Sequence, residues 1–413
     1  MLGRMALKMR WVGNEELDRV AETRWMSYGH ARKDLVRFKE NIHAGPWGRP
    51  GDYLLAEKNG DAVGTASSYA MTMWVRGSAV SCQGVAYVGT IKSARRRGRT
   101  DPGVGSEVMR EVLRIGRERQ QVVSALMPFR ASFYEHFGYG LVERRADWTI
   151  PLSVLPAADC GGWRISSPAD RTAQMDQWQR SVEDGQCDIE RSAARWKNRE
   201  VNEEDGMIFI DRESDSQPAR ASAFVMQESA GGRNILKIQE WSVDSSAAFA
   251  RMLSFFGTMR DQFSTLSIVA PADWQINRLL AESQIPHRPV EHATATACVH
   301  TRMQVRILDH RKYLESLRWP MAARERATIS VAECEGTISR FTVEVDSGRA
   351  QVTEARGEAD FECADRQWAG IATGDFSASQ AVRSGLIRVN SPKALELLDA
   401  LSIGPVPCCR ESF

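Results

Sequence analysis

The sequence predicts a mixed α/β protein with more than one domain. Its 413 residues exceed what a single hydrophobic core usually organises. Apolar residues make up 43% of the chain and charged residues 26%, the balance of an ordinary soluble globular protein. Strand-like and helix-like hydrophobic patterns alternate through three successive regions, and this alternation indicates the α/β class.

The first region extends from Met1 to about Ile150. Residues 52–57 and 62–69 are predicted strands around an Asn59-Gly60 turn, which is a strong hairpin signal. Residues 106–120 repeat apolar side chains on one helical face. Further strands are expected at 84–91, 121–127 and 147–151, and residues 19–40 have helical spacing.

A connector over residues 151–162 leads into a second mixed region, which runs to about residue 300. Its predicted strands are 207–210, 221–226, 236–243 and 266–270, and its predicted helices are 171–182, 192–200 and 246–259. A third region begins near Met303, with strands expected at 327–331, 337–345 and 349–355 and helices at 377–384 and 392–401. Both regions repeat the α/β mixture.

Composition excludes several classes of protein. Lys and Arg total 54 and Asp and Glu total 53, so no charge excess favours nucleic acid or an anionic membrane as a partner. The eight cysteines form no C-x-x-C pair, so we expect reduced thiols and no metal site. No apolar run has transmembrane length, and we expect a cytoplasmic protein.

The segment from Val88 to Gly98 has the features of a phosphate-binding turn. A predicted strand is followed by Arg95, Arg96 and Arg97, then Gly98, and a helix begins shortly afterwards. A helix N-terminus offers free N–H groups, arginines add charge and forked donors, and glycine permits close backbone approach. A basic turn is also a common solvated surface feature, so the segment alone leaves both interpretations open.

Tyr134 lies just after the strand that follows this helix. The order of strand, arginine-rich loop, helix, strand and tyrosine resembles the GNAT family of acetyltransferases. Residues 134–140 (YEHFGYG) resemble the Tyr-x-x-Phe-Gly-Tyr-Gly segment of its Eis-like (enhanced intracellular survival) branch. Residues 303–309 (MQVRILD) resemble the start of the third domain in that branch, and Phe413 matches its final phenylalanine.

The resemblance implies tandem GNAT-like mixed sheets followed by a sterol-carrier-protein-like α+β domain. The expected domains are a catalytic GNAT domain over 1–155, a second GNAT-like domain without a cofactor loop over 156–302, and the C-terminal domain over 303–413. It also implies acetyl-CoA as acyl donor and a homo-oligomer, often a hexamer. The second domain matches the branch only in its layout.

By position, the resemblance assigns cofactor contacts, a general acid and a general base. The cofactor contacts are Val88, Gly89, Thr90, Arg95, Arg96, Arg97, Gly98, Phe129 and Arg130. Tyr134 becomes the acid, because a phenol with a pKa of about 10 is protonated at neutral pH. The carboxylate of Phe413 becomes the base, although its pKa of about 3.5 in water requires burial to raise it. The alternatives are that Tyr134 is only a packed aromatic residue and that Phe413 ends a frayed, inert C-terminus.

The chain departs from the pattern of the branch in the cofactor loop. Residues 99–105 separate Gly98 from the helix, and Gly103 and Gly105 form an equally good pyrophosphate turn, so both sets of glycines remain candidates. His136 is a tempting acid or base, but we expect a surface or structural role. The Cys408-Cys409 pair permits a covalent route only beside an activating base, so we expect structural thiols.

The acyl acceptor is the least determined feature. Residues 24–33 are basic where recognition of a polycationic aminoglycoside requires carboxylates. A less cationic amine or a lysine side chain of a peptide is therefore the expected acceptor. Two competing interpretations remain: a non-catalytic module that binds acyl-CoA or an apolar ligand, and an acyltransferase that uses a longer acyl donor.

Overall fold

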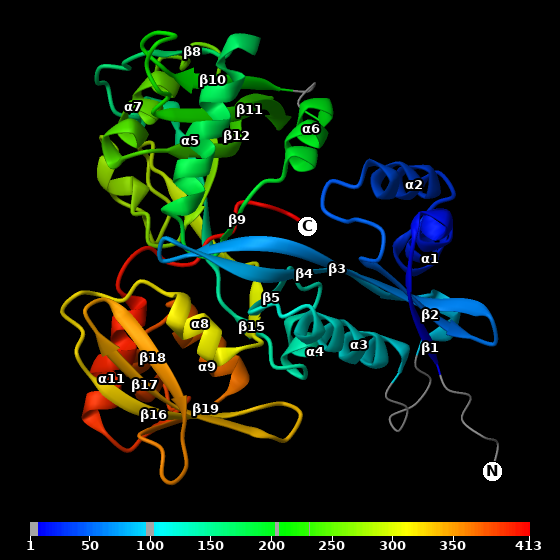
Figure 1. Ribbon diagram of the computed structural model, residues 1–413. Helices are drawn as coiled ribbons and strands as arrows, with labels where there is room; N and C mark the ends of the chain where they lie inside the picture. The colour runs from blue at the N-terminus through cyan, green and yellow to red at the C-terminus, as the bar shows by residue number, and fades with distance from the viewer. Residues whose placement is uncertain (1–6, 96–102, 203–205, 231) are drawn as a thin grey trace.

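Figure 1 shows three sheets in the computed structural model, which describes residues 7–95, 103–202, 206–230 and 232–413. Within these residues the sheets have eight, seven and five strands. Helices pack on each sheet, as the alternating hydrophobic patterns predict. The predicted mixed α/β class is confirmed.

The first sheet runs in the order β1-β2-β3-β4-β5-β15-β6, and β9 pairs with β3. Its strands are β1 (Lys8–Val12), β2 (Tyr53–Lys58), β3 (Asp61–Val75), β4 (Ser78–Thr90), β5 (Val123–Leu126), β6 (Gly140–Leu141), β9 (Asp188–Ile189) and β15 (Gln304–Ile307). Its helices are α1 (Leu17–Tyr28), α2 (Asp34–Ala44), α3 (Val104–Glu118) and α4 (Ala131–Glu135). Asn59 and Gly60, with φ of 56° and 87°, form the predicted hairpin turn.

The helical spacing of residues 19–40 belongs to two helices, α1 and α2, and not to one. Gly29 ends α1 with extended backbone, at φ −63° and ψ 147°. A Cβ at this position would lie 2.3 Å from Cδ1 of Trp25, whose Nε1 donates to the Ala31 carbonyl at 2.9 Å. The Trp25 ring therefore occupies the space beside Gly29, a close contact that hydrophobic periodicity does not reveal.

Strand β4 separates two cores of the first domain. Val85 and Val88 pack with Val108 and the other buried residues of α3 on one face. Cys82 and Ala86 face the second core, which α1 covers on the opposite side. The two faces of β4 are thus covered by different helices.

Strands β4 and β5 are parallel neighbours for only a short distance. Their pairing joins Cys82, Gln83 and Gly84 to residues 123–125, and β4 then continues to Thr90 beside β3 alone. A register shift in the β3–β4 ladder coincides with Tyr87, whose φ is +52°, so β4 bulges there. The two strands therefore separate beyond Gly84 and leave an opening in the sheet.

The second sheet runs in the order β14-β7-β13-β12-β11-β10-β8. Its strands are β7 (Arg144–Pro151), β8 (Trp163–Ile165), β10 (Met207–Asp211), β11 (Ala221–Ala230), β12 (Arg233–Val243), β13 (Thr265–Pro271) and β14 (Thr296–Thr301). Its helices are α5 (Arg171–Glu183), α6 (Ala193–Asn202) and α7 (Ser246–Gly257). The parallel pair β12–β13 repeats the arrangement of β4–β5.

The third sheet runs in the order β18-β17-β16-β19-β20. Its strands are β16 (Arg326–Ala332), β17 (Ile338–Asp346), β18 (Arg349–Glu354), β19 (Phe361–Ala364) and β20 (Arg388–Val389). Its helices are α8 (His310–Ser316), α9 (Asp365–Thr373), α10 (Ala378–Arg383) and α11 (Pro392–Asp399). After the 3-10 turn that follows α11, the chain leaves this domain and returns to the other two (Figure 1).

Three strands pair outside the residue range expected for their domain. β7 precedes residue 155 but lies in the second sheet, and β15 follows residue 302 but lies between β5 and β6. β9 crosses from the second range to pair with β3. The domains are therefore interlocked through shared sheets, and the boundaries at 155 and 302 stay predictions.

Candidate active site

A cavity of about 1030 Å³ is lined by the end of β4, the N-terminus of α3, residues between 129 and 137 and the end of α1. The predicted cofactor residues that line it are Val88, Gly89, Thr90, Arg95, Gly103, Gly105, Phe129 and Arg130. These residues come from β4, the loop after it, the start of α3 and the segment before α4, and the structure brings them together around one cavity. Arg96, Arg97 and Gly98, also predicted contacts, lie outside the described residues.

The N-terminus of α3 forms one wall of this cavity. Gly103 is the N-cap residue, with φ of +75°, and residues 103–106 line the space. A positive φ is a conformation that glycine adopts without strain. The helix N-terminus attracts anions, and Arg95, Arg110 and Arg130 line the same cavity. These residues fit a ligand with an anionic pyrophosphate.

Tyr28, on α1, is a cavity residue that the predicted cofactor set does not include. Its hydroxyl donates to the carbonyl of Val88, one of the predicted pantetheine contacts. Burial raises the pKa of Tyr28 well above its usual value, so the phenol stays protonated. A Cβ on Gly89 would lie 2.9 Å from Cβ of Ser27, so glycine permits the close approach of α1 to β4.

Tyr134 lies on α4 within the core on the α3 side of the sheet, and only 5% of it is exposed. Its ring contacts Phe133, Phe129 and Tyr139 edge-on, with centroids 5.0, 5.9 and 6.2 Å apart. Two of these partners, Phe129 and Phe133, also line the cavity. Burial, with a smaller contribution from Tyr139, raises the pKa of Tyr134 above its usual value, so its hydroxyl retains a proton.

Phe413 lies on the opposite face of the sheet. Its ring packs with the core that α1 covers, and a Cβ on Gly84 would lie 3.2 Å from its Cδ2. Gly84 is the last residue of β4 that pairs with β5. Phe413 therefore lies where the two strands separate, and Tyr134 belongs to the core on the other face of the sheet.

Trp47 of the first domain holds the final residues from one side. Its Nε1 donates to the Ser412 carbonyl at 2.9 Å, and its ring lies edge-on to Phe413 with centroids 6.3 Å apart. Arg302 donates to the carbonyls of Cys409 at 2.8 Å and Glu411 at 3.0 Å. The terminal residues are thus ordered by contacts and do not end as a free tail.

His136 and the cysteine pair have the surroundings of accessory groups. His136 lines the cavity but is exposed, and its Nδ1 lies 2.5 Å from the Ser132 carbonyl, with which it shares one hydrogen bond. Burial raises the pKa of the Cys408 thiol to about 12, and that of Cys409 well above its usual value. Neither cysteine is therefore a thiolate at neutral pH.

One cluster of possible metal ligands lies in the third domain, namely Cys334, Glu335 and Asp365. Arg306 donates to Cys334 Sγ at 3.4 Å and to Glu335 at 2.6 Å. A guanidinium in contact with two of the three groups supplies the positive charge that a cation would bring. The contacts with Arg306 of the same chain therefore account for this cluster without a metal ion.

Three stretches of the chain match known protein families. Residues 8–142 and 187–307 each match a profile described as an acetyltransferase (GNAT) domain, and residues 310–410 match a sterol carrier protein domain. The predicted order of two GNAT-like domains and a sterol-carrier-protein-like domain is confirmed. No curated protein matches the sequence.

Several solved structures share the whole fold. A GCN5-related N-acetyltransferase from Anabaena variabilis has a TM-score of 0.83 at 18% identity, over 99% of this chain and 100% of its own. A probable N-acyltransferase of unknown function from Enterococcus faecalis has a TM-score of 0.81 at 17% identity, over 99% and 100%. Eis1 from Mycobacterium abscessus has a TM-score of 0.79 at 17% identity, with the same coverage. At identities this low, the TM-scores show that these proteins share the fold of this chain.

Proposed function

Because this chain belongs to the GNAT acetyltransferases and has the Eis-like order of domains, we propose that it acetylates an amine by direct transfer from acetyl-CoA. Tyr134 is the general acid and the carboxylate of Phe413 is the general base. The observation that carries the proposal is that Phe413 packs against Gly84, where β4 and β5 separate, while Tyr134 belongs to the core on the other face of the sheet.

The cavity residues favour a CoA-type donor. The N-terminus of α3 and the nearby arginines suit its phosphates, and the part of β4 beyond Gly84 offers a strand edge to an extended amide chain. Acetyl-CoA, when bound, supplies an acetyl thioester at the opening in the sheet. Tyr134 and the apolar side chains around it keep water away from one side of that opening.

The reaction needs two proton movements on opposite sides of the sheet. An amine on the Phe413 side loses a proton to the terminal carboxylate, directly or through a water, and attacks the acetyl carbon. A nitrogen–carbon bond forms as the carbon–sulfur bond breaks. Tyr134, on the other side, gives its phenolic proton to the departing thiolate. Placement of the two reactants supplies a large share of the rate.

The charges near the chain end disfavour a polycationic acceptor. Glu411, the acid nearest the end in sequence, is fully buried and paired with Arg191 and Arg195, so it offers no free charge to an ammonium group. Arg24 is also buried, with its guanidinium 3.9 Å from the ring centroid of Tyr87. A neutral or singly charged amine, or a lysine in a peptide, is the acceptor we propose.

The test is release of free CoA thiol from acetyl-CoA with a panel of amines. The panel contains simple primary amines, a lysine peptide, a polyamine and an aminoglycoside, and parallel reactions use longer acyl-CoA donors. Adding one glycine after Phe413 should abolish most of the turnover, because it moves the carboxylate. Full activity of the extended protein would refute the role of Phe413. Acetyl-CoA binding without turnover on any amine would favour a binding module.

We also propose that the protein is cytoplasmic and forms a homo-oligomer. All eight cysteines are free thiols, which suits a reducing compartment. The oligomeric state is measured by light scattering on the purified protein, where a single subunit mass would contradict it. No helix among the described residues is long and apolar enough to cross a membrane.

A further inference from the structure

The second domain contains a counterpart of the donor cleft. Its parallel pairing of β12 with β13 ends at Ile238 and Ile268. A register shift in the β11–β12 ladder follows at once, at Gln239, as at Tyr87 in β4. The strands then separate, and a cavity of about 330 Å³ between them is lined by residues 239–241, Val243 and residues 269–271.

Among the described residues, the second cleft has a much shorter connection between strand and helix than the first. Only Asp244 and Ser245 join β12 to α7, and Ser245 itself caps the helix by accepting from Ala248 N at 3.2 Å. In the first domain, residues 91–103 separate β4 from α3. The N-terminus of α3 is the phosphate site that we propose in the first domain, and its counterpart, the N-terminus of α7, is capped by a side chain.

The C-terminal tail, residues 405–413, borders the second cleft. Pro405, Val406, Cys408 and Arg410 line the cavity together with both strands. Cys408 N donates to the Gln186 carbonyl at 2.8 Å, and Arg410 Nε donates to Asp188 at 2.6 Å. The tail therefore lies across the second domain before it reaches the first (Figure 1).

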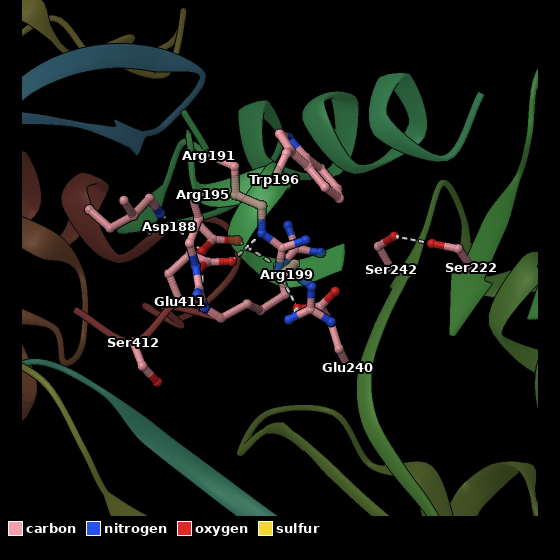
Figure 2. A network of polar contacts seen from close by, with 12 residues as sticks. Asp188, Arg191, Arg195, Trp196, Arg199, Ser222, Glu240, Ser242, Glu411 and Ser412 are labelled. Carbon is pink, nitrogen blue, oxygen red and sulfur yellow. Dashed lines mark hydrogen bonds and ion pairs between the residues drawn. The ribbon is translucent and has the colours of Figure 1, made fainter. Parts of the chain in front are cut away.

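Glu411 attaches this tail to the second domain through two ion pairs. Figure 2 shows Arg191 and Arg195 converging on its carboxylate, with Ser412 beyond. Arg195 Nε lies 2.8 Å from Glu411 Oε2, and Arg191 pairs with Glu411 and also with Glu240 of β12. Burial opposes ionisation of Glu411, but the two arginines outweigh it and hold its pKa below the usual value.

Aromatic rings fix the direction of Arg191. Its guanidinium carbon lies 3.6 Å from the ring centroid of Trp178 and 4.6 Å from that of Trp196. Arg410 lies over Trp178 as well, at 4.1 Å. A buried ion pair with so many geometric restraints contributes little net stability but selects one arrangement of the groups it joins. Here the selected arrangement is that of the tail on the second domain.

We propose that Glu411 is a positioning residue, whose ion pairs with Arg191 and Arg195 fasten the tail to the second domain and thereby set the place of the Phe413 carboxylate. The proposal rests on the proposed role of that carboxylate as base. It gives the second GNAT-like domain a task in catalysis: its cleft holds the chain end that serves the first domain.

The experiment compares Glu411→Gln with a matched variant, Asp170→Asn. Asp170 is also fully buried and paired with two arginines, Arg164 at 2.6 Å and Arg212 at 3.0 Å, but it makes these contacts within the second domain. Both variants lose a buried charge and should lose similar stability. Assays are run well below both unfolding temperatures, with kcat and KM for acetyl-CoA measured on the full chain.

Glu411→Gln should lower kcat by about 100-fold, the cost of displacing a reacting group by about 1 Å, and leave KM for acetyl-CoA within about twofold. Asp170→Asn should keep kcat within about twofold. Glu411→Asp, which restores the charge on a shorter side chain, should recover part of the lost kcat. A kcat for Glu411→Gln equal to that of Asp170→Asn would overturn the inference.

The variant with one glycine after Phe413 separates this inference from the proposed function. If the extension abolishes turnover while Glu411→Gln keeps it, the tail attachment is structural and the base assignment stands. If the extension keeps full turnover, the base assignment fails, and the inference fails with it. Should Glu411→Gln not fold, Arg195→Gln replaces it, because Arg195 is partly exposed and its loss removes one of the two ion pairs that the proposal requires. A kcat equal to that of Asp170→Asn would then overturn the inference.

Discussion

Replacing Tyr134 by Phe removes one oxygen and keeps the ring. The edge-on contacts with Phe129, Phe133 and Tyr139 depend on the ring and are retained. Stability should therefore change by less than about 1 kcal/mol. If the hydroxyl protonates the leaving thiolate, its loss should lower kcat by about 10²- to 10⁴-fold, equivalent to about 3–5 kcal/mol of barrier.

The assay is thiol release at saturating acetyl-CoA, with KM for acetyl-CoA measured beside kcat. KM should stay nearly constant, because the donor cavity is lined by residues other than Tyr134. Tyr139→Phe is the matched control, since Tyr139 is fully buried and loses a hydrogen bond to Ser124 of 2.7 Å. It should lose stability and keep kcat. A Tyr134→Phe enzyme with kcat within about threefold of wild type would refute the acid assignment.

Two further predictions concern donor affinity and acid stability. Arg110→Ala should raise KM for acetyl-CoA several-fold, and the effect should shrink as salt screens this exposed cavity residue; a KM independent of the substitution would contradict its contact with the phosphates. Arg10 hydrogen-bonds to Glu57 and holds its pKa at about 2. The stability that Glu57 contributes is therefore present above its unfolded pKa of about 4.3 and is lost as the pH falls towards 2. In urea unfolding, the difference between wild type and Glu57→Gln should be smaller at pH 3 than at pH 7, and a constant difference would contradict the pairing.

Local sequence patterns predicted the helices and strands well where neighbouring residues decide them. The helix expected at 106–120 is α3, Val104–Glu118, because its apolar side chains share one face. The interruption within residues 19–40 was missed, because it depends on the Trp25 ring packing against Gly29. Short strands such as β15 were missed as members of the first sheet, because their pairing partners are distant in sequence.

The residues of the candidate site also fall into two groups, those predictable from neighbouring residues and those that depend on distant contacts. Val88 to Phe129 could be placed in one cavity from the order of motifs, since strand, loop and helix follow one another along the chain. Tyr28 could not be assigned to the donor side, because helical spacing does not say that its hydroxyl reaches Val88. The one signal in the sequence is Gly89, whose missing side chain lets α1 lie close to β4.

The sequence by itself determined a mixed α/β chain with a basic, glycine-containing loop before a helix, a tyrosine after the next strand, and a terminal phenylalanine. These features arise from neighbouring residues, whose preferences are local. Only the tertiary structure decided that Trp47 and Ser412, 365 residues apart, would meet by one hydrogen bond. It also decided that Glu411 would be neutralised by Arg191 and Arg195. Such contacts depend on how three interlocked domains pack, and no local preference encodes which buried charges will find each other.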